Sequence, residues 1–365
     1  MEKSCFAKVQ KEVEVSTQNL AEANEESRRR NNFDVLRLVA ATMVLVSHSA
    51  PLSGHREGGF PGTNDTLGFV AVLMFFSISG YLVTQSWQRE PEPLAFARKR
   101  FRRIIPGLFV SLVGTAYVIG TLLTTLPIKK YLLSPVPMKF VALNLMQLTN
   151  YKLPGVFENN HSHGANGSLG TLPVEVKAYA MVLVLGMVAI AATKWLRVLW
   201  IVALVPVLAF SYGTGVKPAH TLTLLFLLFA GASAYQLMSE KVPLRWWLFV
   251  LAFSAWLGSY HLPFAAHIVI QALVFPYVVL FLAFRWLGPL RFLVKAGDVS
   301  YGMYIWAFPV QQTIVALHPQ IGYLGLVAVA LLFTYLISFI SWHVIEKPFL
   351  RPRSKKLAST PHGGQ

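Results

Sequence analysis

The chain has 365 residues, of which 55% are apolar and only 13% are charged; an ordinary soluble enzyme, with about a quarter charged residues, does not fit this composition. The single cysteine, Cys5, excludes an intramolecular disulfide and a zinc site built from cysteines. A net charge of +16 would indicate nucleic-acid binding in a soluble protein, so the positions of the basic residues decide its meaning.

The chain begins with a polar tail, residues 1–32, which contains six basic and six acidic side chains but no apolar run typical of a signal peptide. Two long uncharged runs near the other end, Trp246–Phe284 and Val299–Ile345, each contain a central turn with a proline, at 261–263 and 318–320. Between the tail and these runs lie six runs of about one bilayer thickness: Leu38–His55, Thr66–Gln88, Ile104–Ile128, Ala178–Thr193, Val198–Val216 and Pro218–Ser239.

These runs predict an all-α integral membrane protein. Each of the two long runs is about twice the length of a single span, so it forms a hairpin of two helices. Together with the six single runs this gives one membrane domain of ten transmembrane helices, residues 33–350. The chain then closes with a polar tail, residues 351–365.

The basic residues predict the orientation of these helices. With the amino terminus in the cytoplasm, 25 of the 32 lysines and arginines fall on cytoplasmic segments and six fall on outer loops. Cytoplasmic loops of membrane proteins are enriched in Lys and Arg, so both termini are expected in the cytoplasm. This distribution explains the net charge without a nucleic-acid partner, and membrane lipids are the expected contacts of most basic clusters.

Two segments of the predicted membrane domain have an unusual composition. The outer segment from about 129 to 172 contains an uncharged stretch, 140–151, that is too short to span a bilayer, so an interfacial or re-entrant helix is expected there. In the second span, Ser77, Ser79 and Gly80 stand among aromatic residues. Small residues of this kind favour close packing against another helix over contact with a ligand.

Ionisable side chains inside a span are costly, so Arg37 and His48 of the first span are functional candidates. Eleven residues correspond to three helical turns plus about 20°, which places both on one helix face, roughly 16 Å apart. We expect Arg37 near the cytoplasmic boundary and His48 in the outer half, both facing one cavity or groove. The alternatives are that Arg37 is an interfacial anchor and that His48 only hydrogen-bonds a neighbouring helix.

Five cations occur in the six positions from Arg98 to Arg103, where the third span enters from the cytoplasm. Guanidinium groups are permanently charged and bind phosphate in a bidentate manner, so a cofactor with a diphosphate could dock there. The alternative is a cluster that only fixes the orientation of the helix. Near the outer end of the fourth span, Glu175 places a carboxylate at the membrane boundary, to orient a sugar or a histidine, or simply to pair with Lys177 or water.

Taken together, these motifs resemble the integral-membrane acyltransferase family 3, which includes acetyltransferases of O-antigen, exopolysaccharide and Nod factor. The resemblance covers nearly all of residues 33–350. One position departs from the family pattern: Gly170 stands where a bulky aromatic residue is usual, so the outer acceptor pocket is expected to be wider or differently lined. The similar segments are Phe33–Arg37 with Val46–His48, Phe75–Leu82, Arg100–Arg103 with Pro106, Ser168–Leu172 with Glu175, Ser300–Gly302 with Tyr304 and Trp306, and Glu346–Pro348.

The resemblance implies a multi-pass O-acyltransferase of the bacterial cytoplasmic (inner) membrane. Such an enzyme would transfer an acyl group, acetyl in the first place, from cytoplasmic acyl-CoA to a hydroxyl of a cell-surface or lipid-linked glycan. No metal is expected. The CoA phosphates would bind the arginines of the cytoplasmic motif, with Arg37 at the phosphates or at the entrance of the pantetheine arm. The expected cofactor-binding residues are Arg37, Arg100, Arg102 and Arg103.

The same resemblance implies the catalytic residues His48, Arg37 and Glu175. We expect His48 to be the general base, because an imidazole titrates near neutral pH, and a covalent acyl-histidine is the alternative route. A transporter or flippase of isoprenoid-linked glycans is the alternative function. Transporters tend to show inverted repeats and buried carboxylates, and the sequence offers neither clearly.

Overall fold

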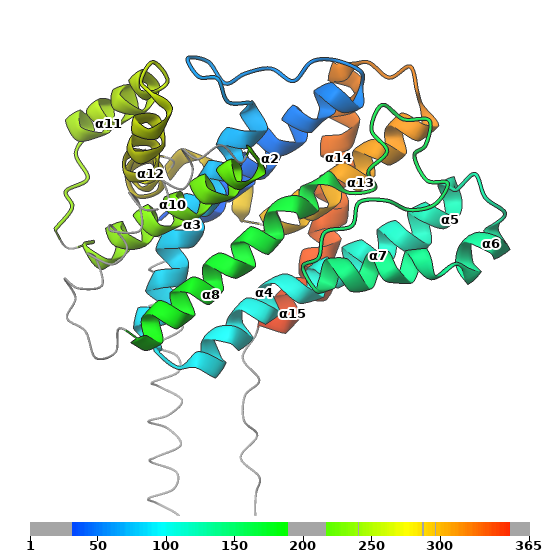
Figure 1. The fold of residues 1–365 in the computed structure, drawn as a ribbon, viewed down its shortest axis with the longest axis horizontal. Helices are drawn as coiled ribbons and strands as arrows, with labels where there is room; N and C mark the ends of the chain where they lie inside the picture. Colours follow the sequence, from blue (N-terminus) through cyan, green and yellow to red (C-terminus); the bar gives the residue numbers. More distant parts are fainter. Residues whose placement is uncertain (1–30, 189–216, 240, 287, 296, 351–365) are drawn as a thin grey trace, which may run out of the picture.

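The computed structural model describes residues 31–188, 217–239, 241–286, 288–295 and 297–350, and within these ranges the chain forms helices and no β-strand (Figure 1). The helices of the first part are α2 (Phe33–Leu52), α3 (Leu67–Arg89), α4 (Pro93–Val113), α5 (Gly120–Leu123), α6 (Ile128–Leu133), α7 (Pro135–Leu145) and α8 (Leu172–Val188). Those of the second part are α10 (Lys217–Leu237), α11 (Trp246–Ser259), α12 (Phe264–Phe281), α13 (Ser300–Leu317), α14 (Tyr323–Ser341) and α15 (Lys347–Leu350).

Short helical turns of other types join some of these helices. A π-helical turn, η1 (Gly114–Ile119), links α4 to α5, and another, η6 (Trp342–Glu346), links α14 to α15. The 3₁₀ turn η2 (Gly167–Thr171) leads directly into α8. Two more, the π turn η4 (Leu282–Trp286) and the 3₁₀ turn η5 (Gly288–Val294), lie between α12 and α13.

Helices α2 and α13 run parallel at the centre of the molecule, and their polar contacts fix the register. At one end, Arg37 of α2 lies 3.9 Å from the carboxylate of Asp298, just before α13. Further along both helices, the side chain of Gln311 donates a hydrogen bond of 2.7 Å to the carbonyl of Leu45. The two helices therefore lead away from the same end of the molecule.

Helix α3 runs antiparallel to α2 and completes this central group. The backbone N–H of Gly68, near the start of α3, donates to the hydroxyl of Ser47 at 2.8 Å. Near the other ends, the rings of Phe33 and Tyr81 are 5.6 Å apart. Apolar residues on several faces of these helices are buried, as expected for helices at the centre of a bundle.

Gly80 brings α3 against α10. A Cβ atom at this position would meet the carbonyl oxygen of Phe229 and would lie 2.9 Å from the Cβ of Ala232, so the contact requires glycine. Beside it, the hydroxyl of Thr84 donates to that of Ser233 at 2.8 Å. The predicted close packing of small residues is confirmed at Gly80.

Six helical segments are long and apolar enough to cross a membrane, which makes the chain a multi-pass membrane protein: Phe33–Leu52, Leu67–Arg89, Pro93–Leu123, Gly167–Val188, Phe264–Arg285 and Tyr323–Leu350. The predicted turns at 261–263 and 318–320 are confirmed between α11 and α12 and between α13 and α14. The expected span Val198–Val216 lies outside the described residues. The count of ten spans and the orientation stay predictions.

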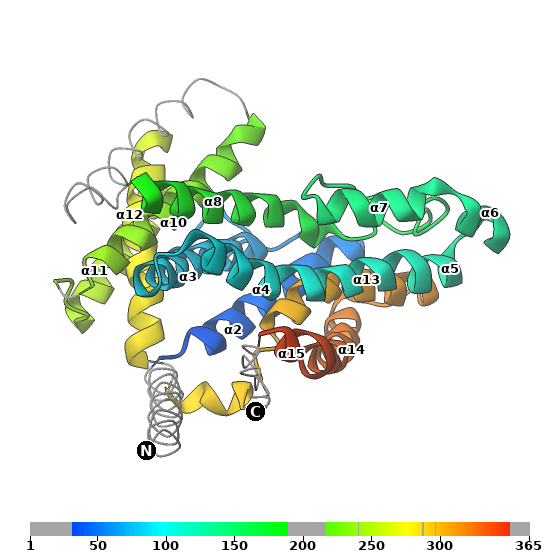
Figure 2. The same cartoon turned by 90° about the horizontal axis from the view of Figure 1, so that it is seen from below.

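The helix expected at 140–151 is present but shifted towards the amino terminus. It is α7, which starts at Pro135 and ends at Leu145. The hydroxyl of Ser134 caps its first turn by accepting from the N–H of Val136 at 3.2 Å, and the chain leaves the helix through Gln147, which has a φ of 60°. Helices α6 and α7 lie at one side of the molecule, and α11 and α12 lie at the other (Figures 1 and 2).

Candidate active site

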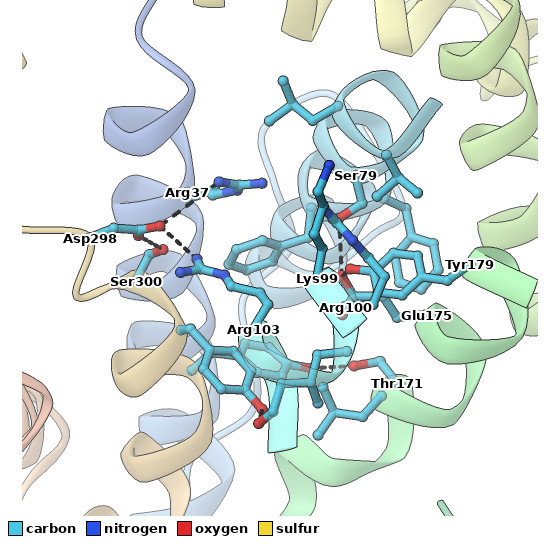
Figure 3. A pocket seen from close by; sticks show the side chains of 18 of the residues that line it. Arg37, Ser79, Lys99, Arg100, Arg103, Thr171, Glu175, Tyr179, Asp298 and Ser300 are labelled. Carbon is cyan, nitrogen blue, oxygen red and sulfur yellow. Dashed lines mark hydrogen bonds and ion pairs between the residues drawn. The ribbon is translucent and has the colours of Figure 1, made fainter. Parts of the chain in front are cut away.

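A cavity of about 470 Å³ lies where α2, α3, α4, α8 and the start of α13 meet (Figure 3). Its volume is within the range of small-molecule sites, about 300 to 1,000 Å³. Its lining combines apolar side chains with six cations and three carboxylates: Arg37, Arg89, Lys99, Arg100, Arg102, Arg103, Asp34, Glu175 and Asp298. We call it the arginine cavity. Five residues selected from the sequence meet there: Arg37, Arg100, Arg102, Arg103 and Glu175.

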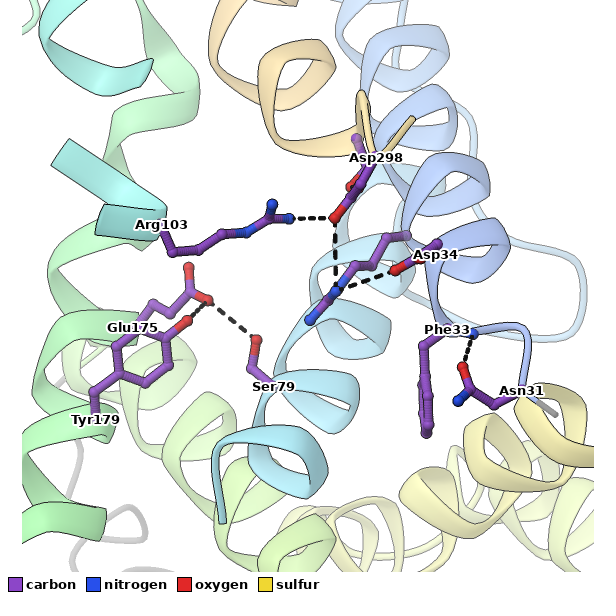
Figure 4. Close-up of polar contacts among 10 residues, drawn as sticks. Asn31, Phe33, Asp34, Ser79, Arg103, Glu175, Tyr179 and Asp298 are labelled. Carbon is purple, nitrogen blue, oxygen red and sulfur yellow. Dashed lines mark hydrogen bonds and ion pairs between the residues drawn. The ribbon is translucent and has the colours of Figure 1, made fainter. Parts of the chain in front are cut away.

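Asp298 joins two of the arginines (Figure 4). One carboxylate oxygen lies 2.6 Å from Arg103 and 3.9 Å from Arg37, and the other accepts a 2.5 Å hydrogen bond from Ser300. Arg37 also lies 3.6 Å from Asp34 on the same helix. Burial opposes ionisation of Asp298, but the two guanidinium groups outweigh it and hold the pKa of this carboxyl at about 2.

Arg100 and Arg102 are placed differently, because neither forms an ion pair with a carboxylate among the described residues. The guanidinium of Arg100 lies over the rings of Phe96 and Tyr179, 5.7 Å from each centroid, and donates to Ser86 at 3.4 Å. Its buried Nε atom has no hydrogen-bond partner in the described part of the chain. These two arginines are therefore the cations most available to an anionic ligand.

Glu175 lies in the first turn of α8, inside the arginine cavity. Its carboxylate accepts hydrogen bonds from Ser79, at 3.1 Å, and from the hydroxyl of Tyr179 (Figures 3 and 4). The sequence placed this carboxylate at the outer boundary, as a partner for a sugar or a histidine. The fold places it beside the arginines because η2 and α8 bring it opposite the second half of α3.

His48 lies outside the arginine cavity, so the expectation that Arg37 and His48 face one cavity is met by Arg37 alone. The imidazole packs edge-on against Phe308 of α13, with ring centroids 5.4 Å apart. Its Nδ1 atom is buried and has no hydrogen-bond partner among the residues described. The neighbouring Ser47 donates to the carboxylate of Glu57, in the loop before α3.

At Gly170, the position where an aromatic residue was expected, the fold supplies one from elsewhere. A Cβ atom on Gly170 would lie 2.7 Å from the hydroxyl of Tyr151, which comes from the loop before η2. The space that a side chain at 170 would enter is therefore occupied by a phenol from another segment. The pocket at this position is lined differently rather than left open.

Comparison with known proteins gives the family. A family model described as an acyltransferase domain matches residues 30–343. The chain belongs to this acyltransferase family. An "O-acetyl transferase" of Shigella phage Sf6 is 30% identical over 353 residues, which cover 90% of this chain and 99% of that protein. "Nodulation protein 10" of Rhizobium leguminosarum bv. viciae is 28% identical over 375 residues, which cover 92% and 98%. No solved structure matches the chain significantly.

The membership makes the protein a membrane-bound O-acyltransferase and decides for an enzyme over a transporter. Among the described residues of this acyltransferase, no group of three or more His, Cys, Asp or Glu side chains could hold a metal ion. The identity of the acyl donor and the roles of single residues are matters for the proposal below.

Sequence reasoning missed three residues of this acyltransferase's cavity: Asp298, Tyr179 and Tyr304. Asp298 had a usable signal, since it is a lone carboxylate just before a predicted span and close to basic segments. The two tyrosines had none, because aromatic residues are common in apolar helices and only the fold shows which of them line a cavity.

Proposed function

We propose that this acyltransferase transfers an acyl group, acetyl in the first place, from cytoplasmic acyl-CoA to a hydroxyl of a cell-surface or lipid-linked glycan, in the inner membrane of a bacterium. The arginine cavity carries the proposal, because its lining holds twice as many cations as carboxylates and suits a donor with several phosphates. The names of the relatives and the resemblance to glycan acetyltransferases support the acceptor class.

In this proposal the phosphates of CoA bind first to Arg100 and Arg102, whose charges no described carboxylate neutralises. Guanidinium groups form paired, charge-assisted hydrogen bonds with phosphate oxygens. Arg103 and Arg37, which share Asp298, contribute the remaining positive charge and face the entrance of the pantetheine arm.

Glu175 acts on the donor side in this proposal. Its hydrogen bond from the hydroxyl of Tyr179 fixes the phenol ring over which the guanidinium of Arg100 lies. Glu175 is therefore a positioning residue for Arg100, rather than a group that orients a histidine. Cation–π contacts of this kind contribute about 0.5 to 2 kcal/mol, enough to select one orientation of a long side chain.

His48 serves as the general base. Arg37 and His48 are about 16 Å apart along α2, a distance that an extended pantetheine arm can bridge. The hydroxyl oxygen of the acceptor attacks the thioester carbonyl while His48 takes the hydroxyl proton. The tetrahedral intermediate then expels the thiolate of CoA, which receives that proton, and the acyl ester remains on the acceptor. A buried imidazole nitrogen without a described partner supports this role.

The substitution His48→Gln tests the proposal. Glutamine keeps a polar side chain of similar reach but cannot carry a proton near neutral pH, so we expect transfer to fall by about 100-fold or more. Thermal stability and acyl-CoA affinity, measured on the same purified sample, should be retained. If His48 only hydrogen-bonded a neighbouring helix, glutamine would be nearly neutral, since such bonds average about 0.6 kcal/mol in membranes.

The matched control is His343→Gln, because His343 is also a helical histidine but is exposed and distant in sequence from the site. It should leave transfer unchanged. A stable His48→Gln protein that keeps more than about a tenth of the turnover would remove the base from the proposal.

A further inference from the structure

Residues of three helices occur in one order from the arginine cavity towards His48. On α2, Arg37 lines the cavity and His48 lies beyond it. On the parallel helix α13, Tyr304 lines the cavity and Phe308, about one turn further, contacts His48. A donor arm that leads from the arginines to His48 therefore has to pass the level of Tyr304.

At that level the passage is occupied. The hydroxyl of Tyr304 is hydrogen-bonded to the hydroxyl of Thr171, at the end of η2. The ring of Phe75, from α3, packs against the ring of Tyr304 in a T-shaped contact with centroids 5.4 Å apart. All three side chains line the arginine cavity, so they form its wall on the side of His48.

A second aromatic layer lies behind this wall. Phe308 packs so closely on Gly167, the first residue of η2, that a Cβ atom there would lie 2.7 Å from its ring. Phe308 is 8% exposed and separates the hydrogen-bonded pair from the imidazole. Both layers are built from the same two elements, α13 and η2.

The helix that carries both aromatic residues is divided between them. Pro309 has no N–H, so the carbonyl of Ile305 lacks its usual donor within α13. Two side chains of other elements replace that donor: Asn166, at 2.9 Å, and Ser111, at 3.2 Å. Side-chain bonds of this kind re-satisfy a helix opened by proline and leave it weaker than a regular turn.

We propose that Thr171, Tyr304 and Phe75 form a closed barrier between the arginine cavity and His48, and that the acyl-bearing end of the donor passes when the Thr171–Tyr304 bond opens. The proposal rests on the function proposed above for His48 and the arginines. These residues then determine the width of the group that reaches the base.

The test uses a single cysteine and needs neither donor nor acceptor, so its failure is separate from failure of the proposed function. Cys5 is the only native cysteine, so Cys5→Ser combined with His48→Cys places one thiol behind the barrier. A membrane-impermeant anionic methanethiosulfonate is added to either face of sealed vesicles, and the rate of modification is measured. Lys99→Cys, at an exposed position of the cavity lining, identifies the arginine side.

With the barrier intact, the thiol at 48 should not react from the arginine side. Adding Tyr304→Phe or Thr171→Val, each of which removes the bond while keeping most of the volume, should increase this rate about fivefold, the factor of one net hydrogen bond. Tyr301→Phe is the matched control: Tyr301 also lines the cavity, but its hydroxyl donates to the carbonyl of Ile104 at 2.9 Å. It should change nothing.

Two outcomes would overturn the barrier. One is reaction of the thiol from the arginine side, at the rate of the Lys99→Cys control, while Thr171 and Tyr304 are unchanged. The other is the absence of any increase in both the Tyr304→Phe and the Thr171→Val proteins. Thermal stability of each protein is measured alongside, and the two substitutions serve as independent removals of the same bond.

Discussion

Single residues in the arginine cavity differ in what their charges are used for. Arg103 neutralises the buried carboxylate of Asp298, whereas Arg100 lies on aromatic rings and has no such partner among the described residues. A buried charge that loses its partner costs several kcal/mol, so these two arginines should respond differently to the same substitution.

We predict that Arg100→Ala raises the KM for acyl-CoA about tenfold or more and leaves thermal stability unchanged, since only contacts with phosphate are lost. Arg100→Lys should restore part of the loss, because an ammonium supplies the charge but not the fork. Steady-state kinetics at limiting acyl-CoA measure both effects. Full activity of the alanine protein under these conditions would show that Arg100 only orients the helix.

We predict that Arg103→Ala lowers the melting temperature because it leaves Asp298 with only the more distant Arg37. Adding Asp298→Asn should recover most of that stability, because the unpaired charge disappears. A thermal double-mutant cycle gives the coupling between the two residues. Additive effects of the two substitutions would contradict the assigned ion pair.

At this scale the sequence predicted the chemistry of the site better than its geometry. The cost of an ionisable group in a span singled out Arg37 and His48, and the run Arg98–Arg103 indicated an anion site, so most of the cavity's charged lining was found. The position of Glu175 was not, because a boundary estimated from hydropathy says nothing about which face of another helix a side chain meets. That depends on the crossing of α3 and α8.

At the scale of elements, the contact between α3 and α10 depends on one missing methyl group. We predict that Gly80→Ala lowers the melting temperature, because the new Cβ would meet the carbonyl oxygen of Phe229 and the helices would have to separate. Overpacking of this kind costs typically about 1 to 3 kcal/mol. Thermal unfolding in detergent measures the change.

The matched control is Gly258→Ala in α11, where an added Cβ would have no neighbour within 4 Å. Alanine favours helix over glycine by roughly 0.5 to 1 kcal/mol, so this protein should be as stable as the parent or slightly more stable. Equal destabilisation by both substitutions would refute the close contact at Gly80.

The helices themselves were largely predictable, because uncharged runs and proline-bearing turns are direct signals of length and punctuation. The shift of the helix at 140–151 shows what such signals lack. Its start follows from the cap of Ser134 before Pro135, and its end follows from the left-handed turn at Gln147, neither of which changes hydropathy. The π-helical turns η1 and η6 likewise left no pattern that could be read.

At the scale of the molecule, the orientation in the membrane remains to be measured. Because most basic residues fall on one side, we predict that a reporter fused after residue 240 is cytoplasmic and one fused after residue 262 is outside. Paired reporters that are active on opposite sides check this in cells. The reverse pattern would place the arginine cavity on the outer face, where cytoplasmic acyl-CoA is absent.

The carbonyl oxygen of Ile305 is a meeting point of three segments that are distant in the chain. It receives Ser111 from the helix of the arginines and Asn166 from the loop that precedes η2, and it belongs to the helix that contacts His48. A displacement of any one segment strains the hold of the other two on this atom. Occupancy of the phosphate end should therefore be felt in the outer loop, and the two substrates should bind with a mutual influence rather than independently.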